Sequence, residues 1–177
     1  MSSDGEKVDL AALNTMPYAD AVRLCAGFFE HSPWIVEAAL KERPFETVEG
    51  LHAACMDAVA SSSEEAKLTL IRAHPDLVGR LAREGGLTRE SRREQASAGL
   101  DALSAAEADQ FEQYNARYRE RFGFPFVICA RKNRTAAILE AFPRRLGQTR
   151  EEEINEAIAQ IGEIARLRMS DAVRDND

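Results

Sequence analysis

The sequence predicts an all-α protein that folds as a single compact domain of about eight or nine helices. Apolar residues recur at three- and four-residue spacing along most of its 177 residues, and Ser or Thr precedes several of these stretches as an N-cap. The chain is 45% hydrophobic and 30% charged, which is typical of folded proteins rather than disordered ones. Its length suits one domain with a sizeable core, and no linker-like stretch divides it.

The N-terminal half is predicted to contain four helices after a flexible terminus at residues 1–12, and the folded domain is assigned to residues 13–174. Ser32 and Pro33 suit the N-cap and the first position of the second helix. Ser62 and Glu65 have the spacing of a capping box for the fourth. The four helices are expected at residues 17–29, 33–43, 48–60 and 62–73.

The C-terminal half is predicted to contain further capped helices. Thr88 suits an N-cap, and capping-box spacing occurs at Ser104 with Glu107 and at Thr149 with Glu152. The apolar run 126–130 is too short for its periodicity to separate strand from helix, and we take it as the start of a buried helix. The helices are expected at residues 77–83 (short), 88–103, 105–121, 135–146 and 150–173.

His74 is the first candidate for chemistry. Pro75 disfavours a helical conformation in the residue before it, so the fourth helix should stop at about His74. The dipole at a helix C-terminus favours a protonated imidazole, which suits a proton donor near neutral pH. An ordinary helix stop, whose histidine caps the last carbonyl groups, explains the same pattern.

Arg168 is the second candidate, because it falls within the apolar stripe of the last helix between Ala165 and Ala172. An arginine there either extends to solvent along its methylenes or turns its guanidinium inward. A buried guanidinium needs a carboxylate, which the protein or a ligand can supply. A structural ion pair and an anion site are therefore both open.

Two further clusters have polar groups or aromatic rings in suggestive patterns. Ser91, Glu94 and Gln95 share one face of the helix after Thr88, where hydroxyl, carboxylate and amide could bind a ureide; a plain solvent face is the alternative. The aromatic run 122–126 could fill the core or form the wall of an apolar pocket for a planar ligand.

Charge and composition exclude several other classes. A net charge of −7 argues against a nucleic-acid partner, and Arg89, Arg92 and Arg93 alternate with acidic residues as on a solvated helix face. The three cysteines have no metal-site or disulfide-framework spacing, so a reducing compartment is expected. No apolar run is long enough to cross a membrane, and we predict a cytoplasmic protein.

Four motifs in one order and spacing resemble the 2-oxo-4-hydroxy-4-carboxy-5-ureidoimidazoline (OHCU) decarboxylase family of urate degradation. The resemblance extends from about Leu13 to Ala172, and its departures are slight: Val78 where alanine is common, and Met169 where leucine is usual. The motifs are Ala73-His74-Pro75-Asp76-Leu77, Ser91-Arg92-Arg93-Glu94-Gln95 with Ala98-Gly99-Leu100, Arg121-Phe122-Gly123-Phe124-Pro125-Phe126, and Ile164-Ala165-Arg166-Leu167-Arg168-Met169.

The resemblance implies a carboxy-lyase that converts OHCU to (S)-allantoin with no metal or other cofactor. It implies that His74 is the catalytic acid, that Arg168 holds the anionic substrate, and that Glu94 acts with them. The partner expected is the small ureidoimidazoline substrate, with no nucleic acid and no membrane; a homodimer is an open possibility. The substrate-binding residues it implies are Pro75, Ser91, Arg92, Arg93, Glu94, Gln95, Phe126, Val127, Ile128, Cys129, Ala130 and Arg168.

Two other functions compete with this interpretation. One is a neighbouring step of urate breakdown, the hydrolysis of 5-hydroxyisourate or of a ureide, for which the sequence shows neither a second domain nor metal ligands. The other is a helical interaction module, which an acidic surface and capped helices would suffice to build. Arg168 argues against the second, because a scaffold gains little from a guanidinium in its apolar stripe.

Overall fold

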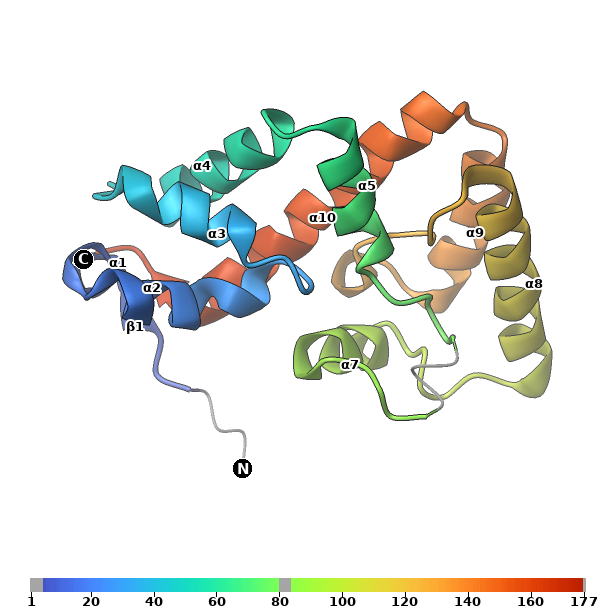
Figure 1. Cartoon of the computed structure of the whole chain (residues 1–177). Helices are drawn as coiled ribbons and strands as arrows, with labels where there is room; N and C mark the ends of the chain where they lie inside the picture. Colours follow the sequence, from blue (N-terminus) through green and yellow to red (C-terminus); the bar gives the residue numbers. More distant parts are fainter. Residues whose placement is uncertain (1–4, 80–83, 177) are drawn as a thin grey trace. The chain divides into compact units, whose positions relative to one another are not determined.

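The computed structural model describes residues 5–79 and 84–176, and these ranges are mainly helical (Figure 1). Their nine α-helices and single pair of two-residue strands confirm the all-α class. The chain forms two compact units, one made of residues up to Ala66 together with those from Gly162 onward, the other of Lys67–Ile161. Helices α5 (Glu64–Arg72) and α10 (Arg150–Ala172) contribute residues to both.

The first unit packs short helices around a small apolar core. Within it α3 (Trp34–Ala39) lies against α4 (Val48–Ala60). Helix α4 begins and ends where the sequence predicts, with the Thr47 hydroxyl accepting from the Gly50 N–H. The other elements of this unit are β1 (Val8–Asp9), α1 (Leu10–Thr15), α2 (Tyr18–Cys25), η1 (Ala26–Phe28), η2 (Leu40–Glu42) and β2 (Val173–Arg174).

The N-terminal segment is ordered further than predicted. Strands β1 and β2 pair in parallel with Val8 opposite Val173, and an Asp9–Arg174 ion pair joins the same strands. Leu10 begins α1 and is fully buried. The prediction of a flexible terminus to residue 12 is therefore wrong for residues 8–12, because the strand that pairs with β1 comes from the distant C-terminus.

Two serines predicted to cap helices donate to nearby carbonyl oxygens instead. The hydroxyl of Ser32 donates to the Glu30 carbonyl oxygen at 2.8 Å rather than capping α3. At α5 the capping hydroxyl is that of Ser63, which accepts from the Ala66 N–H at 3.1 Å, whereas Ser62 donates to the Val59 carbonyl oxygen. Either of the two consecutive serines, Ser62 or Ser63, could cap α5, and where the preceding helix ends decides which one does.

The second unit contains α7 (Arg89–Ser97), α8 (Ala105–Phe122), η3 (Ala130–Lys132), α9 (Thr135–Leu146) and the first part of α10. Helices α8 and α9 lie side by side (Figure 1). The capping boxes predicted at Ser104 with Glu107 and at Thr149 with Glu152 are both present. Helix α7 ends earlier than predicted because Gly99 turns the chain with a φ of 82°.

The segment from Phe124 to Cys129 has no regular secondary structure, and only a short 3-10 turn begins at Ala130, so the predicted helix start at 126–130 is wrong. Side chains from other elements supply its hydrogen bonds: Arg145 Nη1 donates to the Val127 carbonyl oxygen at 2.5 Å, and the Cys129 N–H donates to Gln160 Oε1 at 2.9 Å. Of the short helix predicted at 77–83, residues 80–83 lie outside the described part of the chain, and Leu77 and Val78 form a turn.

Arg145 belongs to a buried polar cluster that the sequence analysis missed. Its Nε donates to Glu153 Oε1 at 2.7 Å, both side chains are fully buried, and the Tyr118 hydroxyl donates to the same carboxylate at 2.6 Å. Burial, together with that bond, raises the pKa of Tyr118 well above its usual value. The available signal was helical spacing, since Arg145 follows Ile138 and Phe142 on the buried face of α9.

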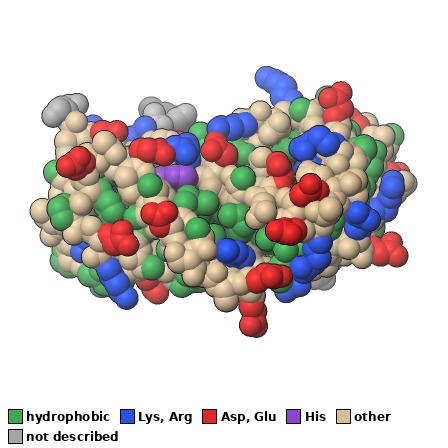
Figure 2. Space-filling view, turned by 90° about the horizontal axis from the view of Figure 1, so that it is seen from above, with side chains coloured by type: hydrophobic (Ala, Val, Ile, Leu, Met, Phe, Trp, Pro, Cys, Tyr) green, Lys and Arg blue, Asp and Glu red, His purple; other side chains and the backbone are tan. Residues whose placement is uncertain are grey.

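The surface carries both signs of charge. Figure 2 shows acidic and basic side chains intermingled on the face drawn, without a broad basic patch. Among the described residues, no helix is both long enough and apolar enough to span a bilayer.

Candidate functional site

His74 lies just beyond the C-terminus of α5 and is 7% exposed. Its backbone N–H donates to the Ile71 carbonyl oxygen, and its ring Nδ1 is 3.0 Å from the Leu70 carbonyl oxygen. Because a carbonyl oxygen only accepts, Nδ1 must carry a hydrogen. The neutral ring is then an acceptor at Nε2 and the protonated ring a donor there, as a group that delivers a proton requires.

The residues after His74 form a tight turn. The Gly79 N–H donates to the Asp76 carbonyl oxygen at 3.3 Å, with Leu77 and Val78 between them. Val78 has a φ of 55°, at the position where a type II turn favours glycine. Its N–H donates to Gln95 Oε1 at 3.1 Å, so α7 contributes directly to the shape of the turn.

The predicted polar face of α7 points into the protein. Ser91 and Gln95 are buried and Glu94 is half-buried, whereas Ala96 is exposed. The interpretation as a plain solvent face is therefore wrong. Thr88 caps the helix as predicted, its hydroxyl accepting from the Ser91 N–H at 3.2 Å.

Two predicted binding residues do not join this face. Arg92 and Arg93 are exposed, and Arg92 Nη2 donates to the Gly85 carbonyl oxygen at 3.2 Å. Arg93, two positions before Gln95, lies on a different face of the helix. Arg92 is three positions before Gln95, but its side chain is exposed to solvent. The structure thus supports Ser91, Glu94 and Gln95 as one constellation, without the two arginines.

Residues 126–130 are all buried, and η3, which begins at Ala130, packs against α7. Thr135 strengthens that contact by donating to the Ala98 carbonyl oxygen at 3.0 Å. Several backbone groups in this segment already have protein partners: the Val127 carbonyl accepts from Arg145, and the Cys129 N–H bonds Gln160. Fewer of its groups are therefore available to a ligand than the resemblance implies.

Arg168 lies in the first unit, and its guanidinium has a carboxylate partner from the protein. Nη2 donates to Glu30 Oε2 at 3.0 Å and Nη1 donates to the Gly27 carbonyl oxygen at 2.9 Å. The side chains of Arg168 and Glu30 are 5% and 2% exposed. Of the two possibilities left open by the sequence, the structural ion pair is therefore present.

Possible metal ligands and the cysteines are the remaining candidate groups among the described residues. Within residues 5–79 and 84–176, no three His, Cys, Asp or Glu side chains are grouped to hold a metal ion. Cys25, Cys55 and Cys129 are buried, and none of the three forms a disulfide. Burial raises the pKa of the Cys25 and Cys55 thiols to about 12, so neither is a nucleophile near neutral pH.

A family model described as OHCU decarboxylase matches residues 14–170 of the chain. The chain belongs to the OHCU decarboxylase family. The family explains why the four motifs occur in one register, since they lie within the matched range. Every candidate site residue, from His74 to Arg168, also falls inside it.

Individual members of the OHCU decarboxylase family match nearly the whole chain. The 2-oxo-4-hydroxy-4-carboxy-5-ureidoimidazoline decarboxylase of Amia calva is 37% identical, covering 94% of this chain and 95% of that protein. The enzyme of the same name from Haloferax volcanii is 42% identical over 81% of this chain and 83% of its own. A crystal structure of (S)-allantoin synthase aligns with a TM-score of 0.75 at 30% identity, covering 93% of this chain; the chain spans about half (54%) of that one.

Proposed function

We propose that this protein is a carboxy-lyase that decarboxylates OHCU to (S)-allantoin in urate degradation. The observation that carries the proposal within the structure is the bond from the Val78 N–H to Gln95 Oε1. It joins the turn that follows His74 to the buried polar face of α7, so the proposed proton donor and the proposed ureide-binding face are linked by a direct hydrogen bond. Membership of the OHCU decarboxylase family supports the same activity.

The proposed reaction needs a proton donor and a binding site, because the substrate's own ring accepts the electron pair and no separate electron sink is required. When the bond to the carboxylate breaks, carbon dioxide leaves and the electron pair passes into the ring, giving an enolate-like intermediate. A proton delivered to one face of a ring carbon completes the product. We assign that delivery to His74 through Nε2, because Nδ1 is committed to the Leu70 carbonyl oxygen.

Gln95 is assigned a donor role toward the substrate. Its Oε1 accepts from the Val78 N–H, and we assign the donor group Nε2 to the ligand. Nε2 would donate to a carbonyl or carboxylate oxygen of the substrate, and the Glu94 carboxylate would accept from the N–H groups of the ureido arm. Ser91 adds a hydroxyl group to this face of α7. Pro75, next to His74 in the chain, is assigned to the apolar wall of the site.

The remaining binding residues are proposals of narrower scope. We assign pocket wall to Phe126 and Val127, and backbone contacts to Ile128 and Ala130. Arg168 is kept as a proposed anchor for the substrate's negative charge, as membership of the family suggests. The cytoplasmic location and the homodimer stay predictions.

Replacing Gln95 with glutamate separates its two roles. A glutamate oxygen can still accept from the Val78 N–H, so the melting temperature should stay within a few degrees of wild type. The donor is lost, and a bond to a charged acceptor contributes ~1.5–3 kcal/mol, so KM should rise by about one to two orders of magnitude. Steady-state kinetics with freshly made OHCU and thermal unfolding measure the two effects.

Gln95→Leu is the comparison variant for this experiment. It removes both the donor and the acceptor, so it should raise KM as well as lower stability, by ~1–3 kcal/mol for the stranded Val78 N–H. If Gln95→Glu kept the wild-type KM, Gln95 would serve the turn alone and not the substrate.

Activity is expected to be independent of metal ions. No spacing in the sequence suits a metal site, so incubation with a strong chelator followed by desalting should leave kcat unchanged. Loss of activity that returns on adding zinc or another divalent metal would contradict the cofactor-free mechanism.

The product's stereochemistry tests the function itself. Fresh OHCU decays without enzyme to racemic allantoin, whereas the protein should accelerate its loss and give (S)-allantoin. Chiral chromatography of allantoin formed with and without the protein makes the comparison. A racemic product formed at the uncatalysed rate would reject the proposed function, and turnover of 5-hydroxyisourate instead would favour the competing hydrolysis.

A further inference from the structure

Helix α8 holds the turn after His74 through two side chains that the proposed chemistry does not use. Arg119 Nε donates to both carboxylate oxygens of Asp76, at 3.0 and 2.9 Å. Four residues earlier on the same helix, Asn115 is 7% exposed and donates through Nδ2 to the Leu77 carbonyl oxygen at 2.8 Å. Two successive residues of the turn are therefore bonded to one face of α8.

The conformation of the turn explains why it needs such bonds. A β-branched residue is strongly disfavoured in the left-handed region, yet Val78 has a φ of 55°. A residue keeps a strained conformation only where several surrounding contacts hold it there. The turn is also tight, since a Cβ on Gly79 would lie 2.7 Å from Asp76 Cβ.

We propose that Asn115 and Arg119 are positioning residues for the reaction: by holding Leu77 and Asp76 they fix the turn, and the turn fixes the imidazole of His74. This inference rests on the proposed function. Neither residue is assigned a contact with the substrate. Their effect reaches the chemistry through His74, which lies two residues before Asp76 in the chain, and small displacements of a catalytic group are costly to rate.

A purely structural role is the alternative. The Asp76 and Arg119 side chains are 23% and 49% exposed, and pairs this exposed add little to folding stability. A structural role therefore predicts a small change in melting temperature and an unchanged kcat. A positioning role predicts a large fall in kcat with the same small change in melting temperature.

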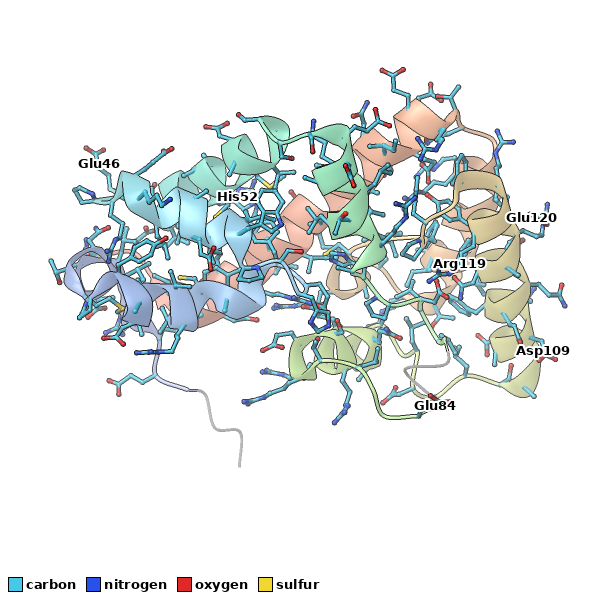
Figure 3. All side chains as sticks on the ribbon, viewed as in Figure 1. Glu46, His52, Glu84, Asp109, Arg119 and Glu120 are labelled. Carbon is cyan, nitrogen blue, oxygen red and sulfur yellow. The ribbon has the colours of Figure 1, made fainter. Side chains whose placement is uncertain are left out.

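Arg119→Met is the principal variant, and Arg117→Met is its matched control. Arg117 is exposed on the same helix, with its guanidinium 6.0 Å from the Tyr114 ring centroid. Figure 3 shows the Arg119 and Glu120 labels on opposite sides of α8, so Glu120→Gln is a second control. For Arg119→Met we expect kcat to fall about 10- to 100-fold with KM within about threefold of wild type. Both controls should keep kcat.

Repeating the change without the imidazole tests whether the effect passes through His74. In a His74→Asn background, Arg119→Met should leave the residual rate unchanged, because the group it positions is absent. An equal fall in both backgrounds, or a wild-type kcat for Arg119→Met, would overturn the inference. If Arg119→Met does not fold, Arg119→Lys, which keeps the charge and one donor, replaces it with an intermediate kcat expected.

The failure of this inference is distinguishable from failure of the proposed function. If the wild-type protein does not accelerate OHCU loss, the function is rejected whatever Arg119 does. If the wild type is active and stereoselective but Arg119→Met matches Arg117→Met, only the positioning role is rejected.

Discussion

His74→Asn is expected to lower kcat by about 10²- to 10⁴-fold, the range that a positioned general acid or base supplies. The fold should be kept, because asparagine Nδ2 can replace the ring Nδ1 as donor to the Leu70 carbonyl oxygen, 3.0 Å away. The variant loses the titratable Nε2, so the allantoin it forms should approach the racemic product of uncatalysed decay. Initial-rate assays of OHCU loss measure the change in kcat, and chiral chromatography of the allantoin measures the change in stereoselectivity.

His31→Asn is the matched control for that substitution. His31 is exposed and has a φ of 45°, a left-handed conformation that asparagine adopts readily. It should therefore keep both the rate and the stereoselectivity of the wild type. If His74→Asn also kept both, His74 would not be the proton donor and the mechanism proposed for this site would be wrong.

Arg168→Met is expected to lower the free energy of unfolding by ~3–5 kcal/mol, because it strands the buried carboxylate of Glu30. The Gly27 carbonyl also loses its guanidinium donor. For a chain of this size the melting temperature should fall by roughly 6–20 °C. Urea unfolding of the free protein measures the loss, and isothermal titration with allantoin separates it from any effect on binding.

Two comparisons make that measurement specific. Arg166→Met changes a neighbour on the same helix whose side chain is 41% exposed and pairs with Glu49, and it should cost no more than about 1 kcal/mol. The double variant Arg168→Met with Glu30→Gln removes both charges and should recover part of the loss. Wild-type stability of Arg168→Met with weakened allantoin binding would instead assign the guanidinium mainly to the ligand.

Local sequence patterns predicted the features that local interactions decide. The capping boxes at Ser104 with Glu107 and Thr149 with Glu152 form as expected, and α4 has the predicted bounds, since each depends on residues within one helical turn. The polar face of α7 was also predictable, because side chains three and four positions apart share a helix face. That this face is buried was not predictable from its composition.

The sequence alone determined the all-α class, most helix boundaries, the family and the stop of α5 just before His74. Only the tertiary structure decided the partner of Arg168 and the non-helical path of residues 126–129. Glu30 and Arg168 are 138 residues apart, and the side chains that bond this non-helical segment come from other helices. Helical periodicity and capping operate over three or four residues, so they carry no information about which distant group satisfies a buried charge or backbone carbonyl.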